Sequence, residues 1–412
     1  MHIRLRAVSI LASACFMLTG CNSTQVAVEQ PKPDYTHQLP PGASALRLIT
    51  DPSRMPDIAA ACNAGKHHVY LAHALDESIA WFNKPSSKTF FPFQGFSHEQ
   101  AMASVYAMRD LLKNSSDEQA FVDAVKSKFD VYESVGYNNQ GIVLFTGYYS
   151  PEFRASLVKT PEFSYPLYKR PADLVTDPNG KPLGRKRADG TVEPYPTRKE
   201  IESSGMLRGT ELVWLPDALS AYIIHVNGSA QLRMPDGSLM YIGYAGKTDR
   251  AYKGLGASMV EAGLINKNDL SLPAIRRVYR ENPQRVQELM NNNECYVFFA
   301  PYDGKNWPAG SLGQQVSAEA TLATDKSIYP RGGIVLVDTD KINFSNAKVR
   351  FQSFMLDQDT GGAIRAPGRA DIYMGVGSSA EILAGGQYAE GRLYYFFLKD
   401  HYVDDYLPAA KK

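Results

Sequence analysis

Residues 359 to 372 read Asp-Thr-Gly-Gly-Ala-Ile-Arg-Ala-Pro-Gly-Arg-Ala-Asp-Ile, and an apolar run from Phe354 to Leu356, followed by Asp357, precedes them. A carboxylate between a buried strand and a glycine pair is a poor structural choice. The glycines expose backbone, and apolar surroundings raise the proton affinity of an acid. A carboxyl group that keeps its proton near neutral pH suits general acid catalysis. An acid beside glycine is also a common turn residue, so this stretch alone leaves both interpretations open.

Two further acids occupy similar settings in the last third of the chain. Asp325 lies in Ala-Thr-Asp-Lys-Ser, and Asp371 lies in Gly-Arg-Ala-Asp-Ile. Each of them singly is typical of a turn. Together with Asp359, however, carboxylates at three strand ends can meet in one cleft, where mutual repulsion keeps one of them protonated.

The tripeptide Asp359-Thr360-Gly361 also matches the catalytic loop of aspartic proteases. Those enzymes need two such loops that share one proton. The nearest second candidate, residues 338–340, reads Asp-Thr-Asp and lacks the glycine. An aspartic protease is therefore the least favoured function.

The composition indicates a soluble globular protein with two or three domains. The 412 residues are 44% hydrophobic and 21% charged, and the formal net charge is +1. A charge this close to zero gives no reason to expect a nucleic-acid partner. The chain has no CxxC, HExxH or histidine cluster, so we expect no metal and no cofactor.

The amino terminus is typical of an exported lipoprotein. Arg4 and Arg6 precede an apolar run, residues 7–18, which is too short to span a bilayer but suits a secretory signal. The run ends in Leu-Thr-Gly-Cys, which resembles a bacterial lipobox with Cys21 as the lipidated residue. The alternative is an ordinary signal peptide with an incidental cysteine, and the small residues before Cys21 favour lipidation. We therefore expect residues 1–20 to be a signal peptide.

Two cysteines remain once residues 1–20 are removed and Cys21 carries lipid. These are Cys62 and Cys295. In an oxidising compartment they can form a disulfide, and two buried free thiols fit the sequence equally well.

The first part of the chain predicts a tether followed by helices. Residues 21–60 are rich in Pro, Gln, Ser and Thr and read as a tether. Apolar residues at helical spacing predict helices over 70–82 and 117–129. Ser97 with Gln100 forms a capping box that predicts a third helix from residue 97 to about 112.

From Gly136 onward the pattern is mainly β. A strand is expected at 142–145, and between there and residue 265 short β-like runs include 221–226 and 239–244. One helix is expected from Ser271 to about residue 291. Further strands are expected at 296–299, 333–337, 349–355 and 392–398, with a helix at 378–384. The chain thus reads as two β-rich bodies with helices at the seams.

Several motifs in chain order resemble the membrane-bound lytic murein transglycosylase A family over residues 140 to 398. Each motif is weak singly, and the ordered series carries the resemblance. The motifs are Thr-Gly-Tyr-Tyr at 146–149, Tyr-Pro-Leu-Tyr at 165–168, Arg-Lys-Glu-Ile at 198–201, His-Val-Asn-Gly-Ser-Ala at 225–230, Gly-Tyr-Ala-Gly-Lys at 243–247, Gly-Ser-Leu-Gly at 310–313, and the three acids.

The resemblance implies a mainly β fold with flanking helices. In that family a second β-domain is inserted into a double-psi β-barrel, and a groove separates the two. Transferred to this chain, residues 61–150 would hold the helices and the first part of the barrel domain. Residues 151–294 would form the inserted domain, and residues 295–402 the remaining part, a three-aspartate domain.

The resemblance also implies the reaction. The family cleaves the β-1,4 bond between N-acetylmuramic acid and N-acetylglucosamine of peptidoglycan and closes a 1,6-anhydro ring without water. Asp359 would protonate the leaving oxygen and then take the proton of the C6 hydroxyl, while Asp325 and Asp371 would orient it. A glycan-binding lipoprotein without catalysis is the alternative.

Substrate contacts are expected from motif residues with hydroxyl, cationic or glycine character. Serines next to small residues can hydrogen-bond sugar hydroxyls, and cations can meet lactyl or stem-peptide carboxylates. The expected partners are glycan strands and, through Cys21, a membrane, which places the protein in the outer membrane facing the periplasm of a Gram-negative bacterium. The residues expected to bind substrate are Thr146, Gly147, Tyr148, Gly228, Ser229, Lys247, Gly310, Ser311, Gly361, Gly362 and Arg369.

Overall fold

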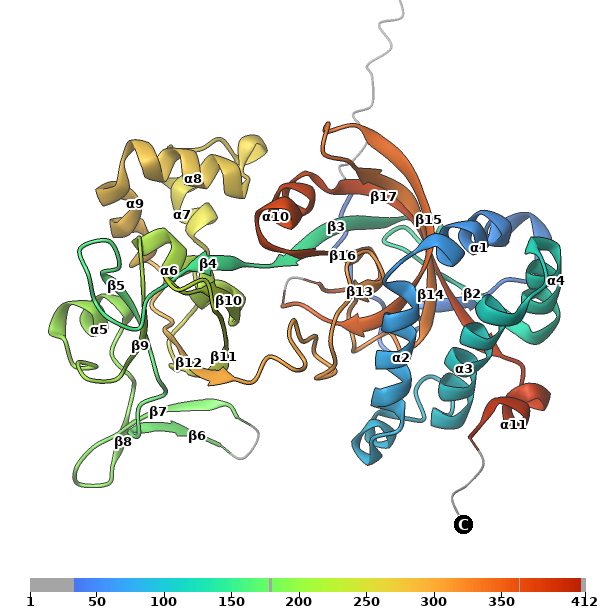
Figure 1. Cartoon of the computed structure of the whole chain (residues 1–412), viewed down its shortest axis with the longest axis horizontal. Helices are drawn as coiled ribbons and strands as arrows, with labels where there is room; N and C mark the ends of the chain where they lie inside the picture. Colours follow the sequence, from blue (N-terminus) through green and yellow to red (C-terminus); the bar gives the residue numbers. More distant parts are fainter. Residues whose placement is uncertain (1–32, 178–179, 363, 409–412) are drawn as a thin grey trace, which may run out of the picture. The chain divides into compact units, whose positions relative to one another are not determined.

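An eight-stranded sheet forms the core of the main body of the protein (Figure 1). The computed structural model describes residues 33–177, 180–362 and 364–408, and both Cys21 and the expected signal peptide lie outside these ranges. The strand order is β1-β2-β17-β14-β15-β13-β16-β3, and β3 also pairs with β17. This extra pairing closes the strands from β17 to β3 into a ring. The strands are β1 (Leu46–Leu48), β2 (Phe129–Ser134), β3 (Val143–Ser150), β13 (Thr321–Ala323), β14 (Ile334–Ile342), β15 (Lys348–Asp359), β16 (Arg369–Val376) and β17 (Tyr388–Leu398).

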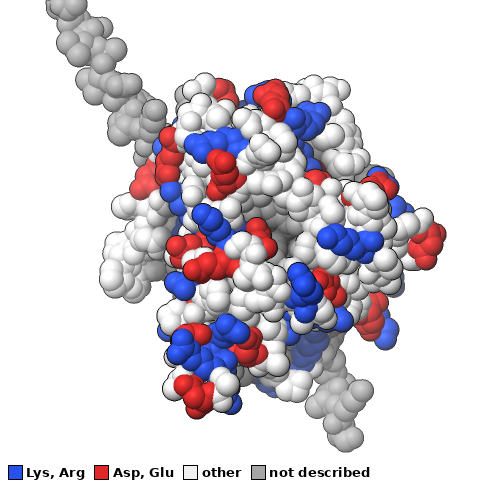
Figure 2. Space-filling view, turned by 90° about the vertical axis from the view of Figure 1, so that its left-hand side faces the viewer, with Lys and Arg blue, Asp and Glu red and all other residues white. Residues whose placement is uncertain are grey.

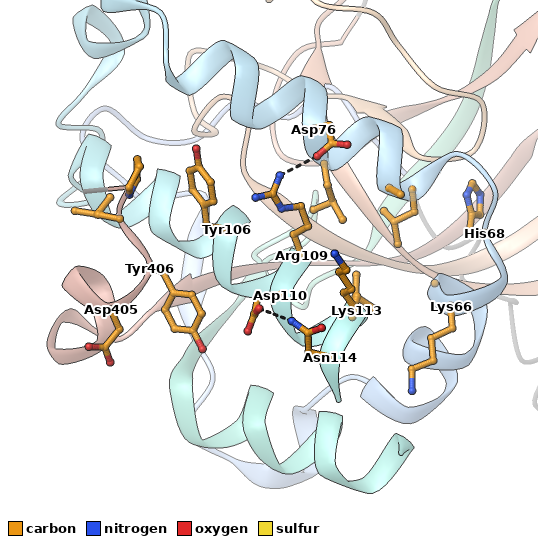
Figure 3. A pocket seen from close by; sticks show the side chains of 17 residues that line it. Lys66, His68, Asp76, Tyr106, Arg109, Asp110, Lys113, Asn114, Asp405 and Tyr406 are labelled. Carbon is orange, nitrogen blue, oxygen red and sulfur yellow. Dashed lines mark hydrogen bonds and ion pairs between the residues drawn. The ribbon is translucent and has the colours of Figure 1, made fainter. Parts of the chain in front are cut away.

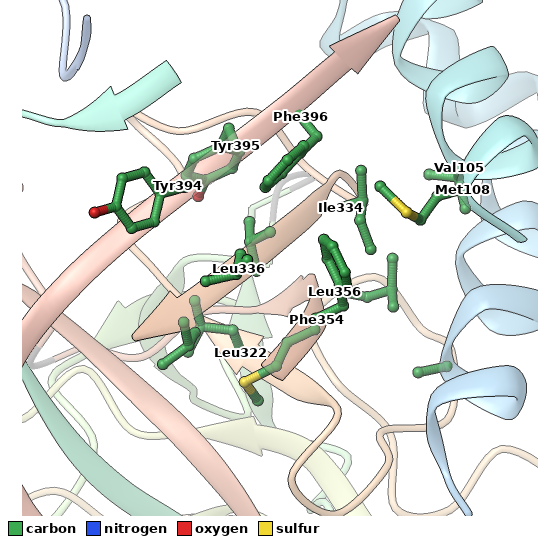
Figure 4. Packing of buried hydrophobic residues seen from close by; sticks show 14 of the residues in the cluster. Val105, Met108, Leu322, Ile334, Leu336, Phe354, Leu356, Tyr394, Tyr395 and Phe396 are labelled. Atoms are coloured by element: carbon green, nitrogen blue, oxygen red, sulfur yellow. The ribbon is translucent and has the colours of Figure 1, made fainter. Parts of the chain in front are cut away.

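Helices from the first third of the chain cover this sheet. Figure 4 shows Val105 and Met108 of α3 facing Ile334 of β14, and all three side chains are buried. Phe354 of β15 is also fully buried in this cluster. Burial of one such side chain stabilises the fold by about 1.5–3 kcal/mol. The helices are α1 (Ile58–His67), α2 (Leu71–Phe82), α3 (His98–Asn114), α4 (Glu118–Lys128), and, from the other end of the chain, α10 (Gly377–Gly386) and α11 (Val403–Tyr406).

Capping residues determine where these helices begin. The Ser97 hydroxyl accepts a hydrogen bond from the Gln100 N–H, which confirms the predicted start of α3, but the Gln100 side chain donates to the Leu398 carbonyl and does not complete the predicted capping box. Asp117 caps α4 by accepting a hydrogen bond from the Ala120 N–H. Residues 45–60 differ from the expected tether, because β1 and the start of α1 lie there. The signal for α1 is Asp57, which caps it by accepting from the Ala60 N–H.

A second body lies between β3 and β13 in the sequence and has its own core. Its four-stranded sheet has the order β12-β11-β10-β4, and β4 pairs with β10 in parallel. Helices cover this sheet and bury a separate set of apolar side chains. The mixture of sheets and helices in two bodies confirms the mainly β class with helices. The elements that matter below are β4 (Glu152–Arg154), α6 (Ala218–Asn227), β10 (Ala230–Arg233), β11 (Leu239–Lys247), α8 (Leu272–Glu281), α9 (Pro283–Met290) and β12 (Val297–Tyr302).

Two expectations for this second body are wrong. Residues 221–226 were expected to be β-like and form part of α6, which Asp217 caps and Gly228 ends in a left-handed conformation at φ 77°. A short apolar run does not distinguish a buried helix from a buried strand. The single helix expected after Ser271 is two helices, because Asn282 ends α8 and caps α9, with Pro283 in its first turn.

Cys62 and Cys295 are buried free thiols, one in each body.

In the described ranges, no helix is long and apolar enough to cross a membrane. On the face in Figure 2, basic and acidic side chains are interspersed and neither sign forms a continuous field.

Candidate active site

Asp359 is the last residue of β15 and lines a cavity beside the end of that strand. Its Oδ1 accepts hydrogen bonds from the backbone N–H groups of Ser311 and Thr360, both at 2.8 Å. Its Oδ2 accepts the hydroxyl hydrogen bond of Tyr148 at 2.9 Å. The donors are all neutral, and the carboxylate forms no ion pair with any residue that the structure describes. The surrounding groups therefore orient Asp359 without supplying a counter-charge.

Tyr148 reaches Asp359 from β3. The register of β3 with β16 pairs Tyr148 with Tyr373, and the two rings lie 5.1 Å apart. Burial, and then the charge of Asp359 and the hydrogen bond to it, raise the pKa of Tyr148 well above its usual value. The phenol therefore remains a hydrogen-bond donor throughout the neutral range.

Asp371 lies on the other side of β13 from Asp359. Ala323 of β13 pairs with Asp359 on one side and with Asp371 on the other. Two strand spacings separate the Cα atoms of the two acids by about 10 Å. Asp371 accepts hydrogen bonds from the Thr146 hydroxyl and from Arg369 Nε, the latter at 3.0 Å. Thr146 and Arg369, both expected to bind substrate, thus contact this acid.

Asp325 takes part in a turn instead of lining the cavity. Its Oδ1 accepts from the N–H and the hydroxyl of Ser327, at 3.0 and 2.6 Å, and its Oδ2 accepts from the N–H of Ala366 at 2.9 Å. Burial alone would raise the pKa of Asp325, but these hydrogen bonds together lower it below its usual value. Two of the three expected acids, Asp359 and Asp371, thus line one cavity. The third, Asp325, instead holds the backbone at Ser327 and Ala366.

The cavity at Asp359 has a volume of about 520 Å³, and a second one of about 570 Å³ shares lining residues with it. Asn227, Ser229 and Ala309 line both of them. Each volume is in the size range of small-molecule sites. Of the residues expected to bind substrate, Gly147, Tyr148, Ser229 and Gly361 line the first cavity, and Gly228, Ser229 and Lys247 line the second.

Two of the predicted glycines are required by close packing. A Cβ at Gly147 would lie 2.7 Å from the Cα of Ala384 in α10, and a Cβ at Gly310 would lie 2.7 Å from a methyl group of Val316 and 2.9 Å from the carbonyl oxygen of Gln358. Gly147 therefore allows α10 to approach β3, and Gly310 allows the loop with Ser311 to approach β15. By contrast, Gly362 faces open space.

A third acid of the cavity was not singled out in the sequence. Glu381 of α10 accepts two hydrogen bonds from Arg276 of α8, at 2.8 and 3.1 Å, and one from the Tyr149 hydroxyl at 3.0 Å. The ion pair joins a helix of the main body to a helix of the second body. Nothing in the local sequence marks this contact, because the partners are 105 residues apart. Of the three acids that line the cavity, Asp371 and Glu381 contact arginines and Asp359 does not.

A larger cavity, of about 970 Å³, lies among the helices (Figure 3). Among its charged groups, Asp76 pairs with Arg109 at 2.9 Å, and Asp110 accepts a hydrogen bond from Asn114 at 2.7 Å. The described residues that line it include no acid at a strand end and none of the motif residues. The chemistry points to the smaller cavity at Asp359. Across the described ranges, no group of three or more His, Cys, Asp or Glu side chains is placed to hold a metal ion.

Comparison with known proteins agrees with this fold. The MltA specific insert domain matches residues 144–300, and the 3D domain matches residues 320–397. The two matches follow one another in the chain, with the insert domain before the 3D domain.

Individual relatives show to which protein family the chain belongs. The membrane-bound lytic murein transglycosylase A of Escherichia coli K12 is 31% identical over 270 residues, which cover 64% of this chain and 68% of that protein. The protein of the same name from Vibrio cholerae is 30% identical over 322 residues, covering 76% and 82%. A crystal structure of E. coli MltA with bound chitohexaose, at 24% identity, matches with a TM-score of 0.63 over 89% of this chain and 96% of that one. This chain belongs to the membrane-bound lytic murein transglycosylase A family.

Proposed function

We propose that this protein is a peptidoglycan lytic transglycosylase. It cleaves the β-1,4 bond between N-acetylmuramic acid and N-acetylglucosamine and leaves a 1,6-anhydro ring on the muramic acid. The observation that carries the proposal is Asp359, the one acid of the cavity without an arginine partner in the described structure. Membership of the family and the chitohexaose bound by the E. coli protein support a glycan as the substrate.

A single carboxyl group without an arginine partner suits this reaction. Glycoside hydrolysis uses two carboxylates, the second as a nucleophile or as the base that activates water. Here Asp371 and Glu381 are engaged by Arg369 and Arg276. In a transglycosylase the C6 hydroxyl of the sugar takes the place of water, so a second carboxylate is not required.

The proton then travels in a closed cycle. Asp359 in its acid form donates its proton to the glycosidic oxygen as the bond from that oxygen to the anomeric carbon breaks. The C6 oxygen forms its bond to the anomeric carbon, and its proton passes to the Asp359 carboxylate. The acid is regenerated, and no water is consumed. Tyr148 and the Ser311 N–H hold the carboxylate in place for both transfers, since they remain donors throughout.

The insert and the polar residues of the second cavity would hold the neighbouring sugars. Ser229 and Lys247 are available there for hydroxyl, N-acetyl or carboxylate groups. Tyr244 lines the same cavity and is 53% exposed, so a sugar ring can stack on it.

The ring of six strands supports a finer description of the fold. We propose that β17, β14, β15, β13, β16 and β3 form a double-psi β-barrel, on the basis of the closing pair between β3 and β17.

The relatives' description as membrane-bound supports a lipid anchor at Cys21 and a location in the outer membrane, facing the periplasm. Replacement Cys21→Ser, followed by separation of membrane and soluble fractions, tests the anchor: loss from the membrane fraction is expected, and full retention would contradict it.

Digestion of purified sacculi with the full chain in detergent tests the reaction, with soluble products analysed by mass. Muropeptides lighter by one water than hydrolytic products are expected, and Asp359→Ala should release none. Products with the added water would make the protein a hydrolase. Binding without release would make it a glycan-binding protein, and cleaved peptide bonds would indicate a protease.

A further inference from the structure

We propose that Glu77, on α2 and outside the cavity, is a positioning residue for Asp359. It acts through the loop of residues 309–316, which presents the Ser311 N–H to the carboxylate. The inference rests on the proposed function of Asp359. It assigns a role in the reaction to a helix that lies outside both matched domains, residues 144–300 and 320–397.

The loop that carries Ser311 is a tight hairpin between β12 and β13. Ala309 and Gln315 form an antiparallel bridge, and the Gly310 N–H donates to the Gln314 carbonyl at 3.0 Å. Ser311 at its tip is exposed, whereas its neighbour Leu312 is buried. The direction of the Ser311 N–H is therefore tied to the opposite side of the hairpin, which carries Gln314 and Gln315.

Glu77 holds this loop from the side of α2. Its Oε2 accepts hydrogen bonds from Gln314 Nε2 at 2.9 Å and from the backbone N–H of Gln315 at 3.2 Å. Lys84, just beyond α2, donates to Gln314 Oε1. Gln314 is only 6% exposed, so breaking these bonds would leave a buried amide without partners.

The same helix also holds the residue next to Asp359. Gln358 Nε2 donates to the carbonyl of Ala74 at 2.8 Å and to the Ser78 hydroxyl at 3.0 Å. Both the strand that carries the carboxylate and the loop that contacts it are thus fixed to one helix. A rigid helix keeps the two in register, and a misplacement of about 1 Å can cost about 10²-fold in rate.

Three variants of full-length protein test the proposal by turnover of sacculi. For Glu77→Ala we expect kcat to fall about 10–100-fold and KM to change little. Glu77→Gln should restore kcat to within about threefold, because its amide oxygen can accept the same two hydrogen bonds. Asp76→Ala is the matched control on the neighbouring position: it removes only an exposed pair with Arg109 and should behave as wild type.

Two results would overturn the proposal. One is a wild-type kcat for Glu77→Ala, and the other is equal impairment of Glu77→Ala and Glu77→Gln. If Glu77→Ala does not fold, Gln314→Ala removes the same contact from the loop side and should show the same fall in kcat with little change in KM. Wild-type protein that releases no anhydro products would contradict the proposed function itself, whereas active wild type with an unaffected Glu77→Ala would contradict this inference alone.

Discussion

Strand β15 carries two acids only two residues apart, Asp357 in its buried part and Asp359 at its end, and the groups that contact the two carboxylates differ. Asp357, at the inner position, is fully buried and forms an ion pair with Lys326. It also accepts the hydroxyl hydrogen bonds of Thr324 and Tyr395, both at 2.8 Å. Asp359, at the outer end, meets neutral donors and an open cavity.

This difference separates a structural acid from the acid that we propose carries the reaction. Burial raises the pKa of Asp357, and the charge of Lys326 opposes that rise. A carboxylate with a fixed counter-charge is held in one state and stabilises the fold only as a pair. A carboxylate held by neutral donors keeps its geometry while its proton leaves and returns, which acid and base catalysis in one residue requires.

Among the variants that test the difference between Asp357 and Asp359, Asp359→Asn should have the largest effect on activity. We expect a fall in kcat of about 10²–10⁴-fold, because the acid and base are lost together. The free energy of unfolding should change by no more than about 0.5 kcal/mol, since the residue faces the cavity. Release of muropeptides over time and urea denaturation measure the two quantities. Residual activity above a tenth of wild type would remove Asp359 from the chemistry.

Asp357→Ala should show the converse. It leaves Lys326 buried without a counter-charge and should lower the free energy of unfolding by about 3–5 kcal/mol. Denaturation with urea measures this loss. As a control, the double variant Asp357→Leu with Lys326→Met should recover most of it, because an apolar pair replaces the ionic one. A loss below about 1 kcal/mol for the single variant would mean that the pair is not structural.

Tyr148→Phe removes one of the neutral donors. We expect activity to fall about 10-fold, as for the loss of a hydrogen bond to a charged group. Because burial and Asp359 raise the pKa of Tyr148 well above its usual value, the phenol itself should add no ionisation to the activity profile near neutral pH. Tyr373→Phe, which loses only a bond to the Ser150 hydroxyl at 2.9 Å, is the matched control. Equal effects in the two variants would mean that the hydrogen bond from Tyr148 to Asp359 has no special part in the reaction.

The smallest effect is expected at Asp325. The hydrogen bonds that lower its pKa stabilise the folded state above the usual carboxyl value of about 3.9, and this contribution is lost as pH falls through the lower folded value. Asp325→Asn should therefore lose about 1 kcal/mol at pH 7 and show a flatter decline of stability below pH 4. Thermal denaturation at a series of pH values measures this. A loss of catalysis as large as that of Asp359→Asn would place Asp325 with the working acids instead.

The sequence predicted those features whose causes are local. The glycine pair beside Asp359, the cap at Ser97 and the apolar spacing of the helix from residue 117 all lie within a few residues of what they determine. Predictions failed, or were not made, where contacts between residues far apart in the sequence determine the structure. The contact from Glu77 to Gln314 spans 237 positions, and the bond from Ala366 that fixes Asp325 spans 41. In α6, apolar content alone suggested a strand, and packing against a second core made it a helix.

The pairing of β3 with both β16 and β17 has a consequence for how the protein reaches its fold. Residues 143–150 find their partners at 369–376 and 388–391, after the whole second body has been made. Pairing over such separations is slow, whereas the second body can form from its own sequence neighbours. The insert should therefore be the first region to gain protection from hydrogen exchange during refolding. The Asp359 carboxylate should acquire its hydrogen bond from Tyr148 only when nearly the entire polypeptide has been assembled.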